Sequence, residues 1–146
     1  MATRHAARAW AMQVLFSLDF NPLTPDQALA LFWKNQLADE KSQRFTGELV
    51  RGVRENQEQL DTIIRRHAAN WNLQRINAVD RNILRVALFE MQHRPDIPPI
   101  VSINEAVDLA KRFSGDESGK FINGILDQAR LALSAAEEGR GDAKQP

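Results

Sequence analysis

The sequence predicts an all-α protein, a compact bundle of about six or seven helices. Apolar residues recur at helical spacing almost throughout the 146 residues, and no segment alternates with a period of two for long. The apolar segments are joined by short connections, and the chain contains no internal repeat. A chain of this length can bury a sizeable core without disulfides or metals. We therefore expect one compact helical domain and not a solenoid.

The first helix is predicted from about Thr3 to Asp19. Its apolar stripe comprises Ala7, Trp10, Ala11, Val14 and Leu18. Pro22 and Pro25 cannot continue this helix. The segment Thr24-Pro25-Asp26-Gln27 predicts a new helix, because threonine can cap it, proline fits the first helical position and glutamine can close a capping box.

A long helical stretch is predicted from about Asp39 to Asn70. Gly52 lies near its middle and indicates either a bend or a close crossing with another helix, since glycine lacks a side chain. The next helix is predicted from about Asn77 to Arg94, where a cluster of three prolines ends it.

Two more helices complete the predicted bundle. Ser102-Ile103-Asn104-Glu105 has the pattern of a capping box and predicts a helix that ends near Gly115. The last helix is predicted from about Asp116 to Glu138. The polar tail, residues 139–146, is expected to be disordered, which leaves a folded domain over residues 1–138.

Composition narrows the classes of function. The 19 basic residues balance the 19 acidic ones, which excludes a sequence-blind polyelectrolyte binder and requires any nucleic-acid contact to use a local patch. The chain has no cysteine, no apolar run long enough to span a membrane and no uninterrupted signal-peptide core, so we expect a cytoplasmic protein. The three histidines show no metal-ligand spacing, and no catalytic constellation or phosphate-binding loop occurs. We expect neither an enzyme nor a metal or cofactor.

Basic and aromatic residues are predicted off the core face of three helices. They are Arg4, His5, Arg8 and Phe16 in the first helix, with Met12 on the same side, Arg81, Arg85 and Phe89 in the helix from Asn77, and Lys120 and Phe121 in the last helix. Guanidinium groups can bind phosphates and exposed rings can stack on unpaired bases, so these residues are candidates for RNA contact. Taken singly, such a residue is more often a solvated charge or the edge of the core than an RNA contact.

Five segments together resemble the NusB family over nearly the whole chain except the tail. They are Arg4–Arg8, Gln13–Phe16, Val79–Glu90, Val101–Lys111 and Lys120–Asp127. The strings Ile103-Asn104-Glu105-Ala106-Val107 and Phe121-Ile122-Asn123-Gly124-Ile125-Leu126-Asp127 are the most specific. The resemblance implies an all-helical fold of two packed helical subdomains, about 1–70 and 71–138. It also implies a transcription antitermination factor that supports processive elongation by RNA polymerase.

The resemblance further implies partners and contact residues. The partners are single-stranded boxA RNA in nascent ribosomal RNA transcripts, the ribosomal protein NusE, and the RNA polymerase antitermination complex. The implied RNA-binding residues are Arg4, His5, Arg8, Arg85, Phe113, Glu117, Lys120 and Phe121. The implied partner-binding residues are Phe16 and Asp80. From the residues alone, Asp80 is equally a first-turn carboxylate facing the helix dipole, and Phe113 belongs to the core.

Two departures from the family pattern affect the predicted RNA affinity. The family's opening has more arginines, whereas His5, Ala6 and Ala7 leave only two here. The family's tyrosine is replaced by Phe16, which cannot donate a hydroxyl hydrogen bond. Both changes predict weaker RNA binding alone and greater dependence on NusE.

Two other classes of protein, and self-association of this chain, remain as alternatives at this point. A helical module of an RNA cytosine methyltransferase would need a catalytic domain with a nucleophilic cysteine, and this chain has none. A purely protein-binding helical adaptor would use the arginines only as solvated charges. Self-association through the peripheral aromatic residues is also open, and it would compete with RNA or NusE.

Overall fold

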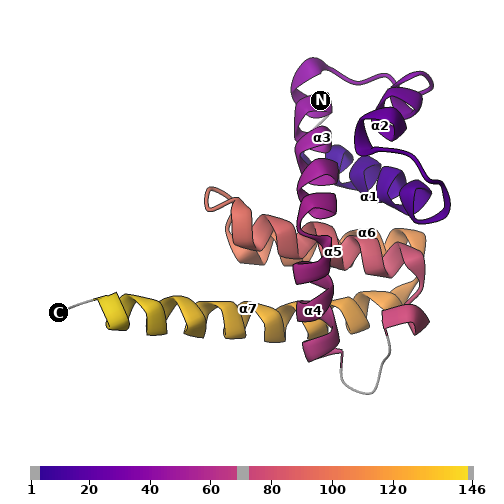
Figure 1. Cartoon of the computed structure of the whole chain (residues 1–146). Coiled ribbons are helices and arrows are strands. Elements are labelled where there is room, and N and C mark those ends of the chain that lie inside the picture. Colours follow the sequence, from indigo (N-terminus) through magenta and orange to yellow (C-terminus); the bar gives the residue numbers. More distant parts are fainter. Residues whose placement is uncertain (1–3, 69–72, 145–146) are drawn as a thin grey trace.

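The computed structural model describes residues 4–68 and 73–144, and this part of the chain is all-helical, as predicted. Side chains are described except at 74 and 137–144. In chain order the elements are α1 (Arg4–Phe20), α2 (Pro25–Trp33), α3 (Glu40–Glu55), α4 (Gln57–His67), the short 3-10 helix η1 (Leu73–Arg75), α5 (Ala78–His93), α6 (Pro99–Phe113) and α7 (Asp116–Lys144). Figure 1 shows α3 and α4 nearly end to end, crossing α5, α6 and α7.

Helix α5 lies at the centre of the protein. It contacts α1, α3, α4, α6 and α7, and every residue from 82 to 90 is buried. A helix enclosed on all sides has no solvated face, so the predicted outward projection of Arg85 and Phe89 is wrong. The predicted subdomain boundary near residue 70 lies outside the described residues and stays a prediction. Helices α1 and α3, from the first predicted subdomain, pack directly on α5.

Gly52 marks a close helix crossing, one of its two predicted roles. A Cβ atom at Gly52 would lie 2.2 Å from ring carbons of Phe89, so only glycine lets α3 approach α5 this closely. The predicted long helix ends four residues later at Asn56, whose side-chain amide donates to the Gly52 carbonyl at 2.8 Å. The stretch is therefore two helices, α3 and α4, with the break at Asn56.

Local signals located one helix start correctly and one incorrectly. The capping box at Thr24 is confirmed, with both reciprocal hydrogen bonds to Gln27 present. The capping box predicted at Ser102 is wrong, because α6 begins three residues earlier at Pro99. Ser102 is buried, and its hydroxyl donates to Glu90 Oε1 at 2.9 Å. A side chain already bonded to a neighbouring helix cannot cap its own.

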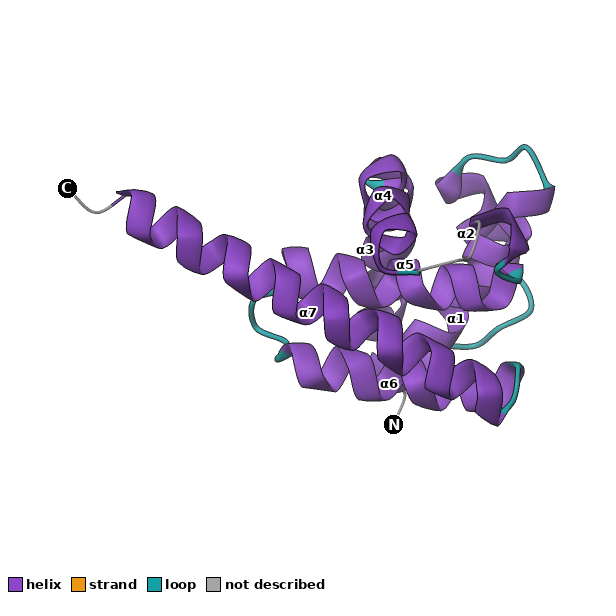
Figure 2. Ribbon diagram, turned by 90° about the horizontal axis from the view of Figure 1, so that it is seen from below, coloured by secondary structure: helices purple, strands orange, loops and turns teal. Residues whose placement is uncertain are grey.

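The end of α6 is as predicted, and the end of α7 is not. Gly115 follows α6 with φ of 114°, and its N–H donates to the Ala110 carbonyl at 3.0 Å. The end of α7 predicted near Glu138 is wrong, because the helix continues to Lys144; residues 145–146 lie outside the described part. The last turns of α7 project beyond the rest of the protein (Figures 1 and 2).

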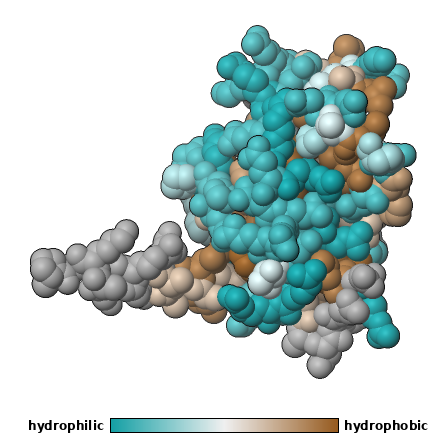
Figure 3. Space-filling view, viewed as in Figure 1, coloured by the Kyte–Doolittle hydropathy of each residue, from teal (hydrophilic) through white to brown (hydrophobic). Residues whose placement is uncertain are grey.

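The view in Figure 3 shows a largely hydrophilic face, with apolar residues gathered along the edge where α1 and α2 lie. None of the described helices is both long and apolar enough to cross a membrane.

Candidate nucleic-acid interface

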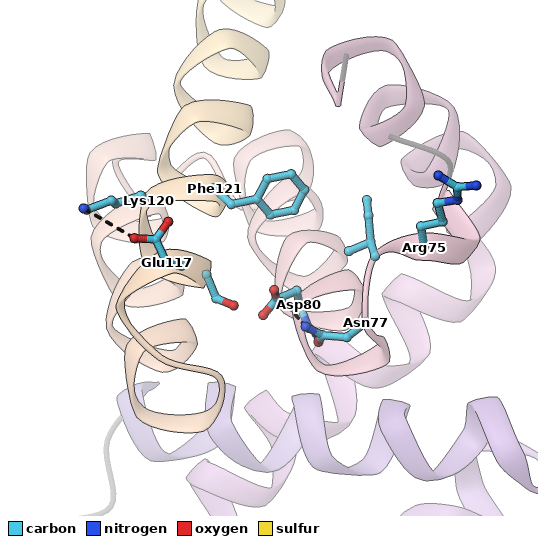
Figure 4. A pocket seen from close by; sticks show the side chains of 8 residues that line it. Arg75, Asn77, Asp80, Glu117, Lys120 and Phe121 are labelled. Carbon is cyan, nitrogen blue, oxygen red and sulfur yellow. Dashed lines mark hydrogen bonds and ion pairs between the residues drawn. The ribbon is translucent and has the colours of Figure 1, made fainter. Parts of the chain in front are cut away.

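A pocket of about 620 Å³ lies between the start of α5 and the start of α7 (Figure 4). Its lining residues are Arg75, Ile76, Asn77, Asp80, Glu117, Ser118, Lys120 and Phe121. Four residues predicted from the sequence therefore meet here: Asp80, Glu117, Lys120 and Phe121. Asp80 and Glu117 are 37 positions apart in the chain. We call this site the α5–α7 pocket.

The first turn of α5 fixes the position of Asp80. Asn77 caps the helix, and its side-chain oxygen accepts the N–H of Asp80 at 2.9 Å. The amide nitrogen of Asn77 donates to Asp80 Oδ2 at 3.1 Å. Asn77 therefore holds Asp80 through both its backbone N–H and its carboxylate. The predicted first-turn placement of this residue is confirmed.

The first turns of α7 supply the other side of the pocket. Lys120 Nζ lies 3.7 Å from Glu117 Oε1, and both side chains are largely exposed. An ion pair this exposed adds little stability and exchanges readily for another partner. Phe121 is half-buried beside the core and directs its ring toward the pocket (Figure 4). This wall therefore combines an aromatic surface with a cation.

A second cluster surrounds the start of α1. Arg4 Nη2 donates to Asp96 Oδ2 at 3.1 Å, and His5 Nδ1 contacts Glu105. The Arg94 guanidinium lowers the pKa of Asp96 to about 2, so this carboxylate stays charged beside Arg4 at neutral pH. Arg4 and His5 of the predicted basic opening are thus already paired with carboxylates. An RNA phosphate would have to compete with these groups.

The end of α6 lies next to this cluster. Arg112 Nη1 is 3.2 Å from His5 Nε2, and the Arg112 guanidinium lies 5.4 Å from the centre of the Phe113 ring. Phe113 is 42% exposed, so assigning it to the core from periodicity was wrong. An exposed ring beside a cation suits base stacking, which agrees with what the resemblance implied for Phe113.

Two arginines predicted to bind RNA lie inside the protein. Arg8 is 3% exposed and pairs with Glu90; Arg85 is 4% exposed and pairs with Asp61 through bonds of 2.7 and 3.0 Å. Their predicted placement off the core is wrong. Helical periodicity could not reveal that each guanidinium has a buried carboxylate partner far away in sequence. In this arrangement any effect of these arginines on RNA would be indirect.

An apolar patch lies on the outer face of α1. Phe16 is 38% exposed, as expected for an off-core residue, and its ring centre is 5.0 Å from that of Phe20, which is 65% exposed. Met12, predicted on the same side, is buried. Phe20 was not predicted from the sequence, although its spacing of four residues from Phe16 places both rings on one helix face.

Four other residues of the pocket wall were not predicted from the sequence: Arg75, Ile76, Asn77 and Ser118. An N-cap pattern could have identified Asn77, because asparagine three residues before a carboxylate is a common helix start. No local signal identifies Arg75 or Ser118. No group of three or more histidines and carboxylates in the described part of the chain could hold a metal ion.

Comparisons with known proteins agree on one family. The NusB family model matches residues 5–130. The transcription antitermination protein NusB of Myxococcus xanthus is 41% identical over 138 residues, covering 92% of this chain and 99% of that protein. The solved structure of T. maritima NusB superposes with a TM-score of 0.81 at 35% identity, covering 89% of this chain and 92% of that one.

A third similar structure is a complex of the antitermination factors NusB and NusE with double-stranded RNA. It superposes with a TM-score of 0.81 at 26% identity, covering 88% of this chain and 96% of the matched chain.

Proposed function

The chain belongs to the NusB family of transcription antitermination proteins, and we propose that it binds boxA RNA together with NusE in an elongating RNA polymerase complex. The family is non-enzymatic, so the function rests on binding alone. The solved complex of related NusB and NusE with RNA supports this pair of ligands. Because the target is a nascent transcript, we place the protein in the cytoplasm.

The convergence of three residues that the resemblance implied for RNA binding, Glu117, Lys120 and Phe121, on the α5–α7 pocket is the observation that most supports RNA binding. Phe121 offers a ring for stacking, and Lys120 and Arg75 offer cations to phosphates. A protein with zero net charge needs such a local site, since its overall field attracts no polyanion. We propose that Phe113 and the Arg4–His5 cluster extend the RNA path.

We propose that NusE contacts the Phe16–Phe20 patch. Neighbouring exposed aromatic rings are typical of protein interfaces. Each ring buries a large area on binding, and only a few side-chain torsion angles lose their freedom. If the protein self-associates, burial of the same patch in a homodimer would compete with NusE.

The test is fluorescence anisotropy of labelled boxA RNA titrated with this protein, with and without NusE, at several salt concentrations. Scrambled RNA and double-stranded boxA are the comparison probes. We expect preference for single-stranded boxA, tightened by NusE because Arg4 and His5 are already paired with acidic groups. Equal binding of all probes with and without NusE would refute the proposal.

A protein-binding adaptor is the second candidate function. The pairing of Arg4 with Asp96 and of His5 with Glu105 favours it, since these basic groups are not free for phosphates. An adaptor's affinity for NusE would be unchanged by added boxA RNA, whereas an RNA-binding factor would show mutual tightening by linkage.

A further inference from the structure

A basic surface lies at the end of α4 and on η1, next to the α5–α7 pocket. Residues 62–79 contain Arg65, Arg66, His67 and Arg75 but no aspartate or glutamate. All three arginines of this segment are exposed. Helix α4 contacts η1, and Figure 1 shows the end of α4 and η1 at the same end of the protein. We call Arg65, Arg66 and Arg75 the α4–η1 basic face.

The two carboxylates that flank this segment do not neutralise it. Asp61 is 6% exposed and accepts two hydrogen bonds from Arg85, at 2.7 and 3.0 Å. Asp80 is 4% exposed and accepts from Asn77. Within the described part of the chain, no arginine of the α4–η1 basic face forms an ion pair. Its three charges therefore face solvent uncompensated.

The cations that the resemblance implied for RNA binding differ in this respect. Arg4 pairs with Asp96, and Lys120 pairs with Glu117. Because the whole chain has zero net charge, positive potential gathers where cations have no carboxylate beside them. The α4–η1 basic face meets this condition, so it should attract a polyanion more strongly than the paired cations do.

We propose that the α4–η1 basic face binds phosphates of the transcript next to boxA, where the RNA strand leaves the α5–α7 pocket. This inference rests on the RNA binding proposed above and adds Arg65 and Arg66 to the RNA path. Arg75 joins the two sites, because it lines the pocket while its guanidinium points away from Lys120 and Glu117 (Figure 4). A guanidinium suits a phosphate, since two of its N–H groups can donate in parallel.

The helix dipole is a simpler reason for a basic last turn in α4, because cations stabilise the C-terminal end of a helix. It does not explain Arg75, which belongs to another element, or the lack of any acidic residue from 62 to 79. The two explanations predict different results. A dipole effect changes stability alone, whereas phosphate binding changes RNA affinity and its dependence on salt.

Phosphate contacts carry no base preference, so the face should act on any single strand adjoining boxA. The experiment compares boxA RNA with boxA RNA extended by about ten uridines on the 5′ or the 3′ side, within the roughly 4–16 nucleotides that a single-strand-binding domain covers. Anisotropy is measured with saturating NusE at several salt concentrations. We expect one of the two extended RNAs to bind about 5-fold more tightly than boxA alone at low salt, and the gain to shrink as salt rises.

The variant Arg65→Gln with Arg66→Gln removes two charges from exposed positions and should abolish most of this gain. The slope of log K against log salt for the extended RNA should fall by about 1.4, since each phosphate contact of a single strand contributes about 0.7. Affinity for unextended boxA should not change. Lys34→Gln with Arg51→Gln is the matched control, because it removes the same charge beside α2, at the opposite end of the protein (Figure 1).

The outcomes separate the two proposals. If the unmodified protein does not prefer boxA over scrambled RNA, the proposed function fails and this inference fails with it. If boxA is preferred but neither extension tightens binding, or the double variant keeps the gain, only the inference is overturned. Loss of NusE affinity in the double variant, with the gain unchanged, would assign the face to the protein partner instead. If the double variant folds poorly, each single substitution carries the same test, with an expected fall in slope of about 0.7.

Discussion

Arg8 and Glu90 form a two-bond ion pair inside the protein, with Nε 2.7 Å from Oε2 and Nη2 2.9 Å from Oε1. Ser102 donates a third hydrogen bond to the same carboxylate, so the pair joins α1, α5 and α6. Glu90 is fully buried. The start of α1 is therefore fixed to the centre of the fold by an arginine that periodicity had placed on the surface.

Replacing Arg8 with alanine should lower the free energy of unfolding by about 3–5 kcal/mol, because it leaves the Glu90 carboxylate buried without its cation. Urea denaturation followed by circular dichroism measures this change. Arg4→Ala is the matched control, since Arg4 lies one turn away in an exposed pair and should cost less than about 1 kcal/mol. Equal losses for the two variants would contradict the buried role of Arg8.

Gly52→Ala should destabilise the protein by about 1–3 kcal/mol, because the new methyl group would lie 2.2 Å from the Phe89 ring. Phe89→Leu in the same chain should recover part of the loss by opening space. Gly124→Ala is the control: no atom lies within 4 Å of a Cβ there, and alanine should stabilise this helical position by about 0.5–1 kcal/mol. Thermal melting of the variants tests the crossing, and a neutral Gly52→Ala would contradict it.

Sequence information identified those parts of the fold and interface that depend on neighbours in the chain. The capping box at Thr24 was predictable because both of its hydrogen bonds join residues three apart. The environment of Arg8 was not, since its partner Glu90 is 82 positions away. The α5–α7 pocket was predictable only in part. The family resemblance identified Asp80 and Phe121, but no local pattern revealed that they share a cavity or that one oxygen of Asp80 is unpaired.

Phe16→Ala and Phe20→Ala should each weaken NusE binding by about 5- to 30-fold, as expected for an exposed aromatic anchor of a protein interface. RNA binding by the protein alone should not change. Isothermal titration with NusE measures the effect, and Leu37→Ala is a control at a strongly exposed apolar residue away from α1. If Leu37→Ala weakens NusE binding as much as Phe16→Ala does, the patch is not the site.

The pKa of Asp96 should rise from about 2 toward its ordinary value of 3.8 when Arg94 is replaced by alanine, because the Arg94 hydrogen bond is the main cause of the shift. A carboxylate whose pKa is lowered by folding stabilises the protein above pH 4, and this contribution is lost as the pH falls from about 4 to 2. The effect on stability is small because the carboxylate is exposed. A carboxyl-carbon NMR titration measures the pKa directly, and an unchanged value in Arg94→Ala would contradict the assigned cause.

The most direct test of RNA binding at the α5–α7 pocket is the dissociation constant of boxA RNA, with saturating NusE, for Phe121→Leu against the unmodified protein. Leucine keeps apolar volume against the core but removes the aromatic face, so we predict about 10-fold weaker binding with unchanged NusE affinity and helicity. Equal RNA affinity for the two proteins would contradict the account, because it would mean that no base stacks on Phe121.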